Sequence, residues 1–68
     1  MIVKKLKELK QGDFFTLQDY GDYPKDYVVF VRGEYDKSVR KYSTYKYSDV
    51  NHEVLRNGDK LVYTDFIF

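Results

Sequence analysis

The predicted fold is decided by one stretch, Tyr27-Val-Val-Phe-Val-Arg-Gly-Glu-Tyr35, Asp36-Lys37-Ser38 and Val39-Arg-Lys-Tyr-Ser-Thr-Tyr-Lys-Tyr47. Its first and last parts are rich in β-branched and aromatic residues, which favour strands. Short polar residues separate these two parts. We therefore predict an antiparallel β-hairpin over residues 27–47, with a three-residue turn at 36–38.

The register of this hairpin determines which side chains share a face, because a slip of one residue moves every side chain to the opposite face. A three-residue turn pairs Glu34 with Arg40, and it gathers most of the tyrosines and valines on one face. A two-residue turn would instead place Arg40 and Lys46 on that apolar face, so we favour the longer turn. The opposite face then carries the residues that we predict to bind a partner: Phe30, Arg32, Arg40, Tyr42, Thr44 and Lys46.

Strand and turn signals continue on both sides of the hairpin. Residues 1–10 favour a short strand followed by a helical or 3₁₀ turn near 5–10, although an amphipathic helix is the alternative. Residues 13–17 indicate a strand, 18–26 a polar loop, 48–53 a short helical turn, and Asn57-Gly58 a second hairpin between 53–56 and 60–68. About five short antiparallel strands predict a single all-β, or mostly β, domain over residues 1–68. We expect an SH3-like barrel or roll, with a partial OB-like barrel as the alternative.

A short motif occurs twice, as Leu9-Lys-Gln-Gly-Asp13 and as Leu55-Arg-Asn-Gly-Asp59, each time before an apolar strand. We interpret both copies as tight turns in which glycine adopts a positive φ, because glycine has no Cβ to oppose that conformation. A duplication or a shared ligand loop is the alternative.

Composition limits the classes of function. The 68 residues include eight Tyr and five Phe but no Cys or Trp. A domain of this size buries only about 60% of the surface of its unfolded chain, and large rings give a short chain an efficient core. Without cysteine the chain has neither disulfide nor thiolate chemistry. The net charge of +1 is not the strongly basic balance of a dedicated nucleic-acid binder.

The sequence also carries no signal for a membrane or for export. No apolar run approaches the ~18 residues of a membrane-spanning helix. The start, Met1-Ile2-Val3-Lys4-Lys5, lacks the apolar core of a signal peptide. We therefore expect a cytoplasmic protein with no membrane partner.

A pattern of four motifs resembles a type of small protein found in phages and conjugative elements of gut and Gram-positive bacteria. The motifs are Gly12-Asp13-Phe14-Phe15, Val31-Arg32-Gly33-Glu34-Tyr35-Asp36, Lys41-Tyr42 and Tyr63-Thr64-Asp65-Phe66. The resemblance runs along nearly the whole chain, and such proteins have no known activity. It implies an accessory role in a mobile element, for example the inhibition of a host protein or a defence system. It implies no site residues.

Catalysis has little support in the residues. His52 is the only histidine, and no Gly-x-Ser-x-Gly motif is present, so we predict no catalytic residues and no enzyme. Asp49, His52 and Glu53 offer oxygen and nitrogen donors, but they are too few for a metal site. We therefore predict neither a metal nor a cofactor.

Binding has more support, because the predicted polar face mixes Arg32, Arg40 and Lys46 with rings. Arg and Tyr are typical of protein interfaces, whereas the same residues can also meet phosphates and stack on bases. A third interpretation is a stabilising outer face of cross-strand pairs. We expect a non-enzymatic interaction module that binds a protein partner, with nucleic-acid or nucleotide binding as the alternative. Edge strands and a small core also leave a homodimer open.

Overall fold

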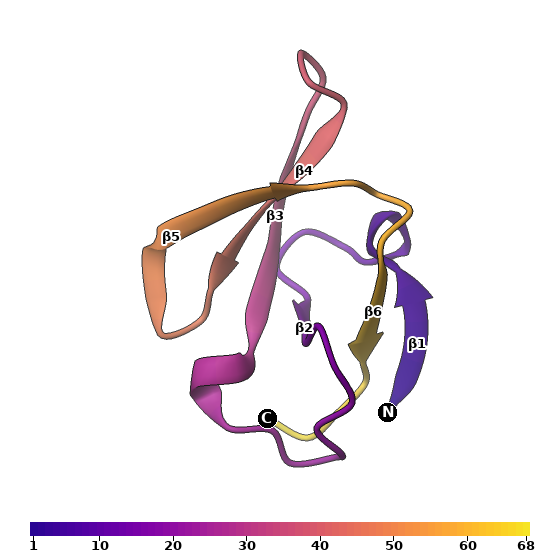
Figure 1. Cartoon of the computed structure of the whole chain (residues 1–68), viewed down its shortest axis with the longest axis vertical. Helices are drawn as coiled ribbons and strands as arrows, with labels where there is room; N and C mark the ends of the chain where they lie inside the picture. Colours follow the sequence, from indigo (N-terminus) through magenta and orange to yellow (C-terminus); the bar gives the residue numbers. More distant parts are fainter.

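The computed structural model describes residues 1–68, which form six strands and two 3₁₀ turns (Figure 1). Strands β1 and β6 form one antiparallel sheet, and β2, β3, β4 and β5 form a second one in that order. The all-β prediction is confirmed, although these sheets do not close into a barrel. The elements are β1 (Ile2–Lys5), η1 (Leu6–Glu8), β2 (Phe14–Phe15), η2 (Asp26–Val28), β3 (Phe30–Asp36), β4 (Lys41–Lys46), β5 (Asp49–Arg56) and β6 (Leu61–Thr64).

A single bridge joins the two sheets. Beyond β2 the chain continues to Thr16, whose N–H donates to the carbonyl of Tyr63 at 2.9 Å, and the N–H of Tyr63 donates back to Thr16 at 3.0 Å. Because Tyr63 belongs to β6, this bridge holds β6 beside the end of β2. The sheets therefore enclose a common interior.

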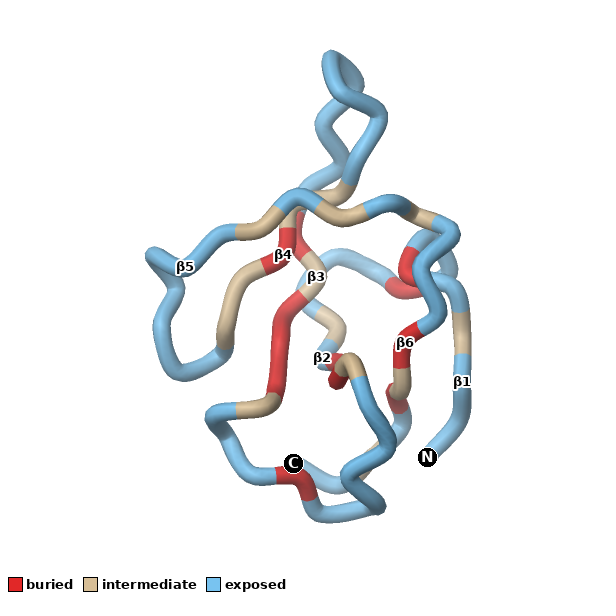
Figure 2. Tube along the Cα trace, viewed as in Figure 1, coloured by how far each residue is buried: buried red, intermediate tan, exposed pale blue.

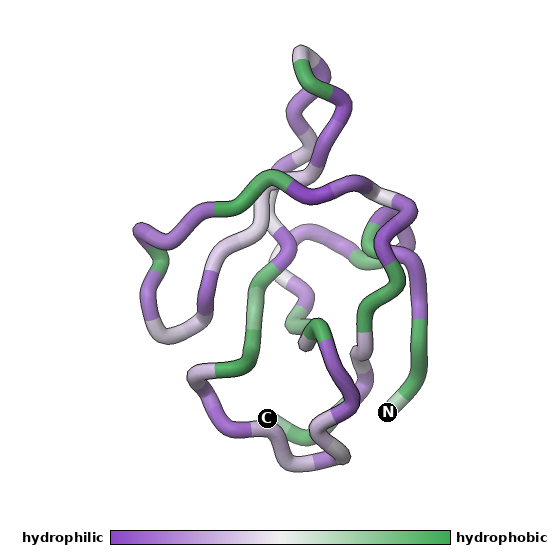
Figure 3. The backbone as a smooth tube through the Cα atoms, viewed as in Figure 1, coloured by the Kyte–Doolittle hydropathy of each residue, from purple (hydrophilic) through white to green (hydrophobic).

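The core lies in that interior. It is formed by Leu6 from η1, Leu9, Phe15, Phe30 and Val62, with Leu17 and Tyr42 packed against it. Leu6, Phe15 and Val62 are completely buried, and Figure 2 shows buried positions along strands of both sheets, including β3, β4 and β6. Figure 3 shows hydrophobic stretches along β3, β6 and β1, whereas the two arms leading to the tip of the β3–β4 hairpin are mostly hydrophilic.

A second aromatic cluster packs outside this core. Phe14, Tyr47 and Phe68 meet edge to face, with ring centroids 4.8–5.7 Å apart, and Phe66 lies 6.4 Å from Phe68. Edge-to-face pairs each contribute about 0.5–1.5 kcal/mol beyond the area they bury. The segment after β6 is therefore packed, although it is not the continuous strand to residue 68 that we predicted.

The loop over residues 18–26 forms hydrogen bonds with both ends of the chain. The carboxylate of Asp22 accepts a hydrogen bond from the amino group of Met1 at 3.3 Å. The backbone carbonyl of Asp22 accepts one from the N–H of Ile67 at 2.7 Å. The loop therefore contacts both the residue before β1 and the segment after β6. Both ends of the chain lie toward the same end of the molecule in Figure 1.

The β3–β4 hairpin is confirmed, but its first arm begins at Phe30 and not at Tyr27, because Asp26–Val28 form η2. Its predicted register is also wrong. Arg32 pairs with Thr44 and not with Tyr42, and a bulge after Arg32 brings Tyr35 opposite Tyr42. The turn spans the four residues 37–40. Asp36 stabilises it by accepting hydrogen bonds from the N–H and the hydroxyl of Ser38. Arg40 takes the left-handed conformation, with φ 55°, that glycine usually supplies.

Two further predictions fail around β5. Residues 48–53 do not form a helical turn, because the chain reverses at residues 47–48 and β5 then pairs with β4 at Asp49 and again from Glu53 to Arg56. Consequently β5 and β6 lie in different sheets, and Asn57-Gly58 does not join a hairpin. The N–H of Lys60 bonds the carbonyl of Asn57 at 3.1 Å, so the motif turns a corner between the sheets. The 3₁₀ turn predicted near residues 5–10 is confirmed as η1.

Candidate functional site

Five of the six predicted site residues share one face of β3 and β4. Phe30 is opposite Lys46, Arg32 is opposite Thr44, and Tyr42 alternates with Thr44 along β4. The sixth, Arg40, lies exposed in the turn at the tip of the hairpin and joins neither face. The hairpin therefore assembles most of the predicted set, but in a different register from the one predicted.

This shared face turns inward, so the prediction that it forms an exposed surface is wrong. Thr44 has no exposed area, and Phe30 is 8% exposed and belongs to the core. Arg32, Tyr42 and Lys46 are half-buried at its border. Burial of the Phe30 and Tyr42 rings favours this orientation, because it stabilises the fold more than the partial desolvation of Arg32 and Lys46 destabilises it. Long Arg and Lys side chains bury their stems and keep their charged ends near solvent.

Two arginines cover rings on this inner face. The guanidinium of Arg32 lies 4.3 Å from the centroid of the Tyr42 ring, and its Nη1 donates to the carbonyl of Gly33 at 2.7 Å. The Nε atom of Arg32 is buried and has no hydrogen-bond partner. The guanidinium of Arg56 lies 5.1 Å from the centroid of the Phe30 ring. Such contacts contribute about 0.5–2 kcal/mol each, more where they are shielded from water.

Arg56 was not among the predicted site residues. Its Nε donates to the hydroxyl of Thr44 at 3.1 Å, and that hydroxyl donates to the carbonyl of Val54 at 2.7 Å. Burial lowers the pKa of Arg56, but a guanidinium stays charged at neutral pH. Arg56 reaches this face because β5 pairs with β4. The sequence pattern instead predicts pairing of residues 53–56 with residues 60–68, so it does not predict this position.

A small pocket opens at the edge of the inner face. Another small hollow, of about 210 Å³, lies beside Phe14, but it touches none of the predicted site residues. None of Arg32, Lys46 and Arg56 takes part in an ion pair. The pocket, of about 240 Å³, is lined by Leu17, Gln18, Tyr20, Tyr27, Val28, Phe30 and Lys46.

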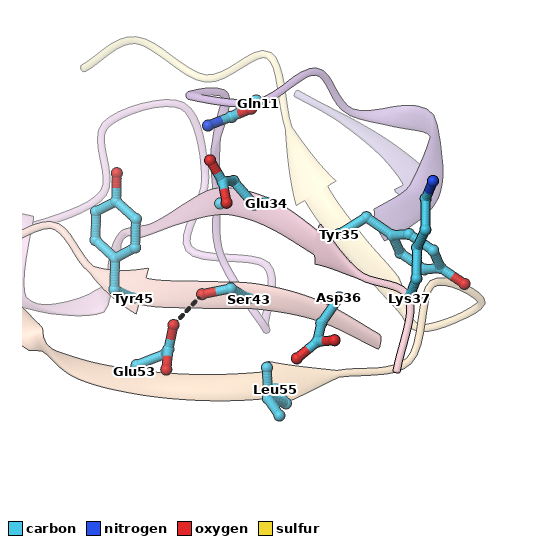
Figure 4. A pocket seen from close by; sticks show the side chains of 10 residues that line it. Gln11, Glu34, Tyr35, Asp36, Lys37, Ser43, Tyr45, Glu53 and Leu55 are labelled. Atoms are coloured by element: carbon cyan, nitrogen blue, oxygen red, sulfur yellow. Dashed lines mark hydrogen bonds between the residues drawn. The ribbon is translucent and has the colours of Figure 1, made fainter. Parts of the chain in front are cut away.

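The largest hollow lies on the opposite, outer face of the same sheet. It is an open groove of about 580 Å³ over β3, β4 and β5 (Figure 4). Cross-strand pairs place Ser43 beside Leu55 and Tyr45 beside Glu53 along this face. The groove is lined by Gln11, Gly33, Glu34, Tyr35, Asp36, Lys37, Ser43, Tyr45, Glu53 and Leu55.

The charges of this outer groove are mainly negative. Glu34, Asp36 and Glu53 line it, and none of them takes part in an ion pair. The hydroxyl of Ser43 donates a hydrogen bond to Glu53, as Figure 4 shows. Hydrogen bonds from Ser38 hold the pKa of Asp36 below its ordinary value, so this carboxylate stays charged at neutral pH. Sequence reasoning missed the groove, because it treated the face with most of the tyrosines and valines as buried. Val29 and Val31 of that face are buried, but the part over Ser43 and Tyr45 is open.

The structure also bears on metal binding and on membrane-spanning helices. No group of three or more His, Cys, Asp or Glu side chains lies close enough together to hold a metal ion. The structure also contains no helix that is long and apolar enough to cross a membrane. Comparison with protein-family models, curated proteins and solved structures gave no match to this chain.

Proposed function

We propose that this protein is a non-enzymatic interaction module that binds a protein partner, and that the outer groove receives a basic segment of that partner. The observation that carries this proposal is the groove itself, whose three carboxylates form no ion pair within the chain, although Lys37 also lines it. Carboxylates form strong charge-assisted hydrogen bonds with Arg and Lys. The neighbouring Tyr45 and Leu55 offer apolar surface to the stem of such a side chain.

The fold and the resemblance add two further parts to this proposal. The Thr16–Tyr63 bridge places β1, β6 and β2 beside β3, β4 and β5, which supports an open SH3-like roll. The resemblance to small proteins of phages and conjugative elements supports an accessory role. In that role the partner is a host protein in the cytoplasm, which the module inhibits by occupying a basic surface.

A charge reversal in the groove tests the proposal. Glu34→Lys changes a lining carboxylate that makes no ion pair. Asp26→Lys is the matched control, because it changes the net charge equally at an exposed position outside the groove. Tagged wild-type protein and both variants are used to capture partners from a bacterial lysate. We expect one protein to be recovered in stoichiometric amount by wild type and Asp26→Lys only.

The same experiment has a clear negative result. Equal recovery of this protein by Glu34→Lys would rule out the groove as its binding surface. Arg40→Glu and Tyr42→Ala extend the comparison to the surface predicted from the sequence. Loss of the partner with these two variants alone would return the interface to the β3–β4 hairpin and its inner face.

A second function is favoured by the inner face. Arg32, Lys46 and Arg56 are cations without ion pairs, and they lie beside Tyr42 and the core ring of Phe30. Such an arrangement suits a nucleotide or a single-stranded nucleic acid, because stacking on an aromatic ring contributes about 1–3 kcal/mol per base. We propose nucleic-acid or nucleotide binding as the alternative function.

Fluorescence polarisation with labelled single strands decides this alternative. If phosphates are neutralised, log K falls with log salt with a slope of about −0.7 per phosphate. Arg56→Gln should then reduce the slope, whereas Lys25→Gln, at an exposed position in the loop, should not. Absent or salt-independent binding would exclude an electrostatic nucleic-acid site.

A further inference from the structure

One edge of β5 has no neighbouring strand, so its backbone hydrogen-bonding groups are unpaired. Strand β5 ends the order β2-β3-β4-β5, so only one of its sides is paired. It is the longest strand, with eight residues, and six of them are exposed. Every second residue of β5 directs its N–H and C=O toward the free side, where no strand pairs with them. Such an edge is a template for another extended chain.

The second half of strand β5, from Glu53 to Arg56, lacks the usual protection against strand addition. Edge strands are commonly blunted by lysine, by proline, by a β-bulge or by being short. Strand β1, an edge of the two-stranded sheet, has only four residues and carries Lys4 and Lys5. Strand β5 contains neither lysine nor proline. An irregularity between Tyr45 and Lys46 leaves residues 50–52 without partners in β4, whereas the segment from Glu53 to Arg56 is in regular register with β4.

Charge argues against a second copy of the chain as the occupant. Two copies that pair through β5 about a two-fold axis keep their outer faces on the same side of the continuous sheet. The two acidic grooves would then adjoin, and Glu53 of each copy would lie close to Glu53 of the other. Like charges at such cross-strand positions are destabilising. A partner with basic residues on the same face removes this repulsion.

We infer that β5 takes up an extended segment of the partner protein as an additional strand, with Lys or Arg on the side of the outer groove. This inference rests on the proposed function and specifies the partner. The side chain beside Glu53 is basic, and the one beside Leu55 is apolar or a long basic chain whose stem packs there. The side chain between them faces the inner side next to Val54, so it is β-branched and apolar.

The probe for this inference is the labelled peptide Thr-Lys-Val-Lys-Val-Lys-Val-Thr. Its control is the same peptide with Glu in place of Lys. Two further versions carry N-methyl groups, one on the three Lys nitrogens and the other on the three Val nitrogens. Alternate N–H groups of a strand point to opposite edges, so only one of these versions loses the hydrogen bonds to β5. We expect one methylated peptide to bind at least about tenfold more weakly, and the other to bind like the parent.

Variants of the protein and amide exchange complete the test. Glu53→Gln should weaken the parent peptide, whereas Asp26→Asn, which removes the same charge outside the groove, should not. In the complex, exchange of alternate β5 amides should slow by about tenfold or more, because new backbone hydrogen bonds protect them. The Glu-containing peptide should not bind.

The outcomes separate the strand from the groove. Equal binding of both methylated peptides, whether both bind or neither does, would overturn strand addition. If the parent peptide still binds and depends on Glu53, binding of a basic segment in the acidic outer groove stands without strand addition. If the parent peptide does not bind, both the binding of a basic segment in the groove and the strand addition are wrong. Formation of a dimer by the free protein at the concentrations used would assign the β5 edge to a second copy instead.

Discussion

Replacement of Gly58 by Ala should destabilise this protein through a collision and not through backbone strain. A Cβ at residue 58 would lie 2.7 Å from Cε2 of Tyr42 and 3.1 Å from Cβ of Lys7. Ordinary van der Waals contact begins at 3.4 Å, so the Tyr42 ring would have to retreat by about 0.7 Å. The φ angle of Gly58 is not positive, in contrast to φ 95° at Gly12. Backbone conformation therefore does not require glycine at this position.

The retreat is costly because the Tyr42 ring is held from two sides. The guanidinium of Arg32 lies 4.3 Å from its centroid, and the Tyr35 ring lies 4.8 Å away. Overpacking of this kind costs about 1–3 kcal/mol. For a domain of this size, each kcal/mol lowers the melting temperature by about 4–8 °C. We therefore expect Gly58→Ala to lower the free energy of unfolding by about 2 kcal/mol.

A double-mutant cycle with Tyr42→Leu isolates the collision. The shorter side chain removes Cε2, so only the contact with Lys7 remains, and Gly58→Ala should then cost less than about 1 kcal/mol. Urea unfolding followed by far-ultraviolet circular dichroism measures all four proteins, with the slope m checking that the unfolded states are comparable. An equal cost of Gly58→Ala in both backgrounds would refute the reasoning. That result would show that the backbone at residue 58 is what requires glycine.

Three further predictions follow from single contacts. Thr44→Val should lower the free energy of unfolding by about 1–2 kcal/mol in urea unfolding, because it removes a buried hydroxyl and the acceptor for Nε of Arg56. Phe68→Ala should cost about 1–3 kcal/mol and change the near-ultraviolet dichroism, because the ring makes edge-to-face contacts with three other rings; an unchanged stability would mean that the aromatic cluster is not formed in solution. A hydrogen bond from Lys7 lowers the pKa of Asp59, so the stabilisation by Asp59 is present above the ordinary pKa of about 3.9 and is lost as the pH falls through the lower pKa of the folded state. Asp59→Asn should therefore weaken the dependence of the urea midpoint on pH in that window. The same acid dependence in the variant and in wild type would contradict this prediction.

The face assignment of the hairpin could be predicted in part, although its register could not. The predicted register paired Arg32 with Tyr42, and the structure pairs it with Thr44. This is a slip of two residues, and side chains alternate with a period of two. Phe30, Arg32, Thr44 and Lys46 therefore remain together on one face. The exact pairing depends on the bulge and on the conformation of the turn, and neither has a local sequence signal here.

The direction of that face could not be predicted from residue types. Arg32 and Lys46 mark it as polar, but Phe30 and Tyr42 supply the surface that the interior needs. The two requirements are compatible because an arginine can lie over a ring while its end remains near solvent. A pattern that counts each arginine as exposed therefore assigns this face to the wrong side.

The motif at residues 55–59 shows how tertiary contacts override a local signal. Asn57-Gly58 is typical of a two-residue hairpin, yet β5 pairs with β4 and leaves β6 to pair with β1. The sequence around Gly12 is nearly identical, and there the predicted positive φ is present. The two copies differ at Lys10/Arg56 and Gln11/Asn57 and in their surroundings, because Tyr42 lies close to Gly58, whereas a Cβ at Gly12 would meet nothing within 4 Å.

The charges of the four-stranded sheet are separated between its two faces, and this separation favours the outer groove over the inner face as a binding surface. The arginines of the inner face are already engaged, since Arg32 lies over Tyr42 and Arg56 bonds Thr44. An inner-face ligand must compete with these contacts. A cation that approaches Glu34 or Glu53 displaces only water and, at Glu53, one hydroxyl. A rigid basic partner therefore gains more at the outer groove, and removal of Arg56 should affect the stability of the protein more than its binding to such a partner.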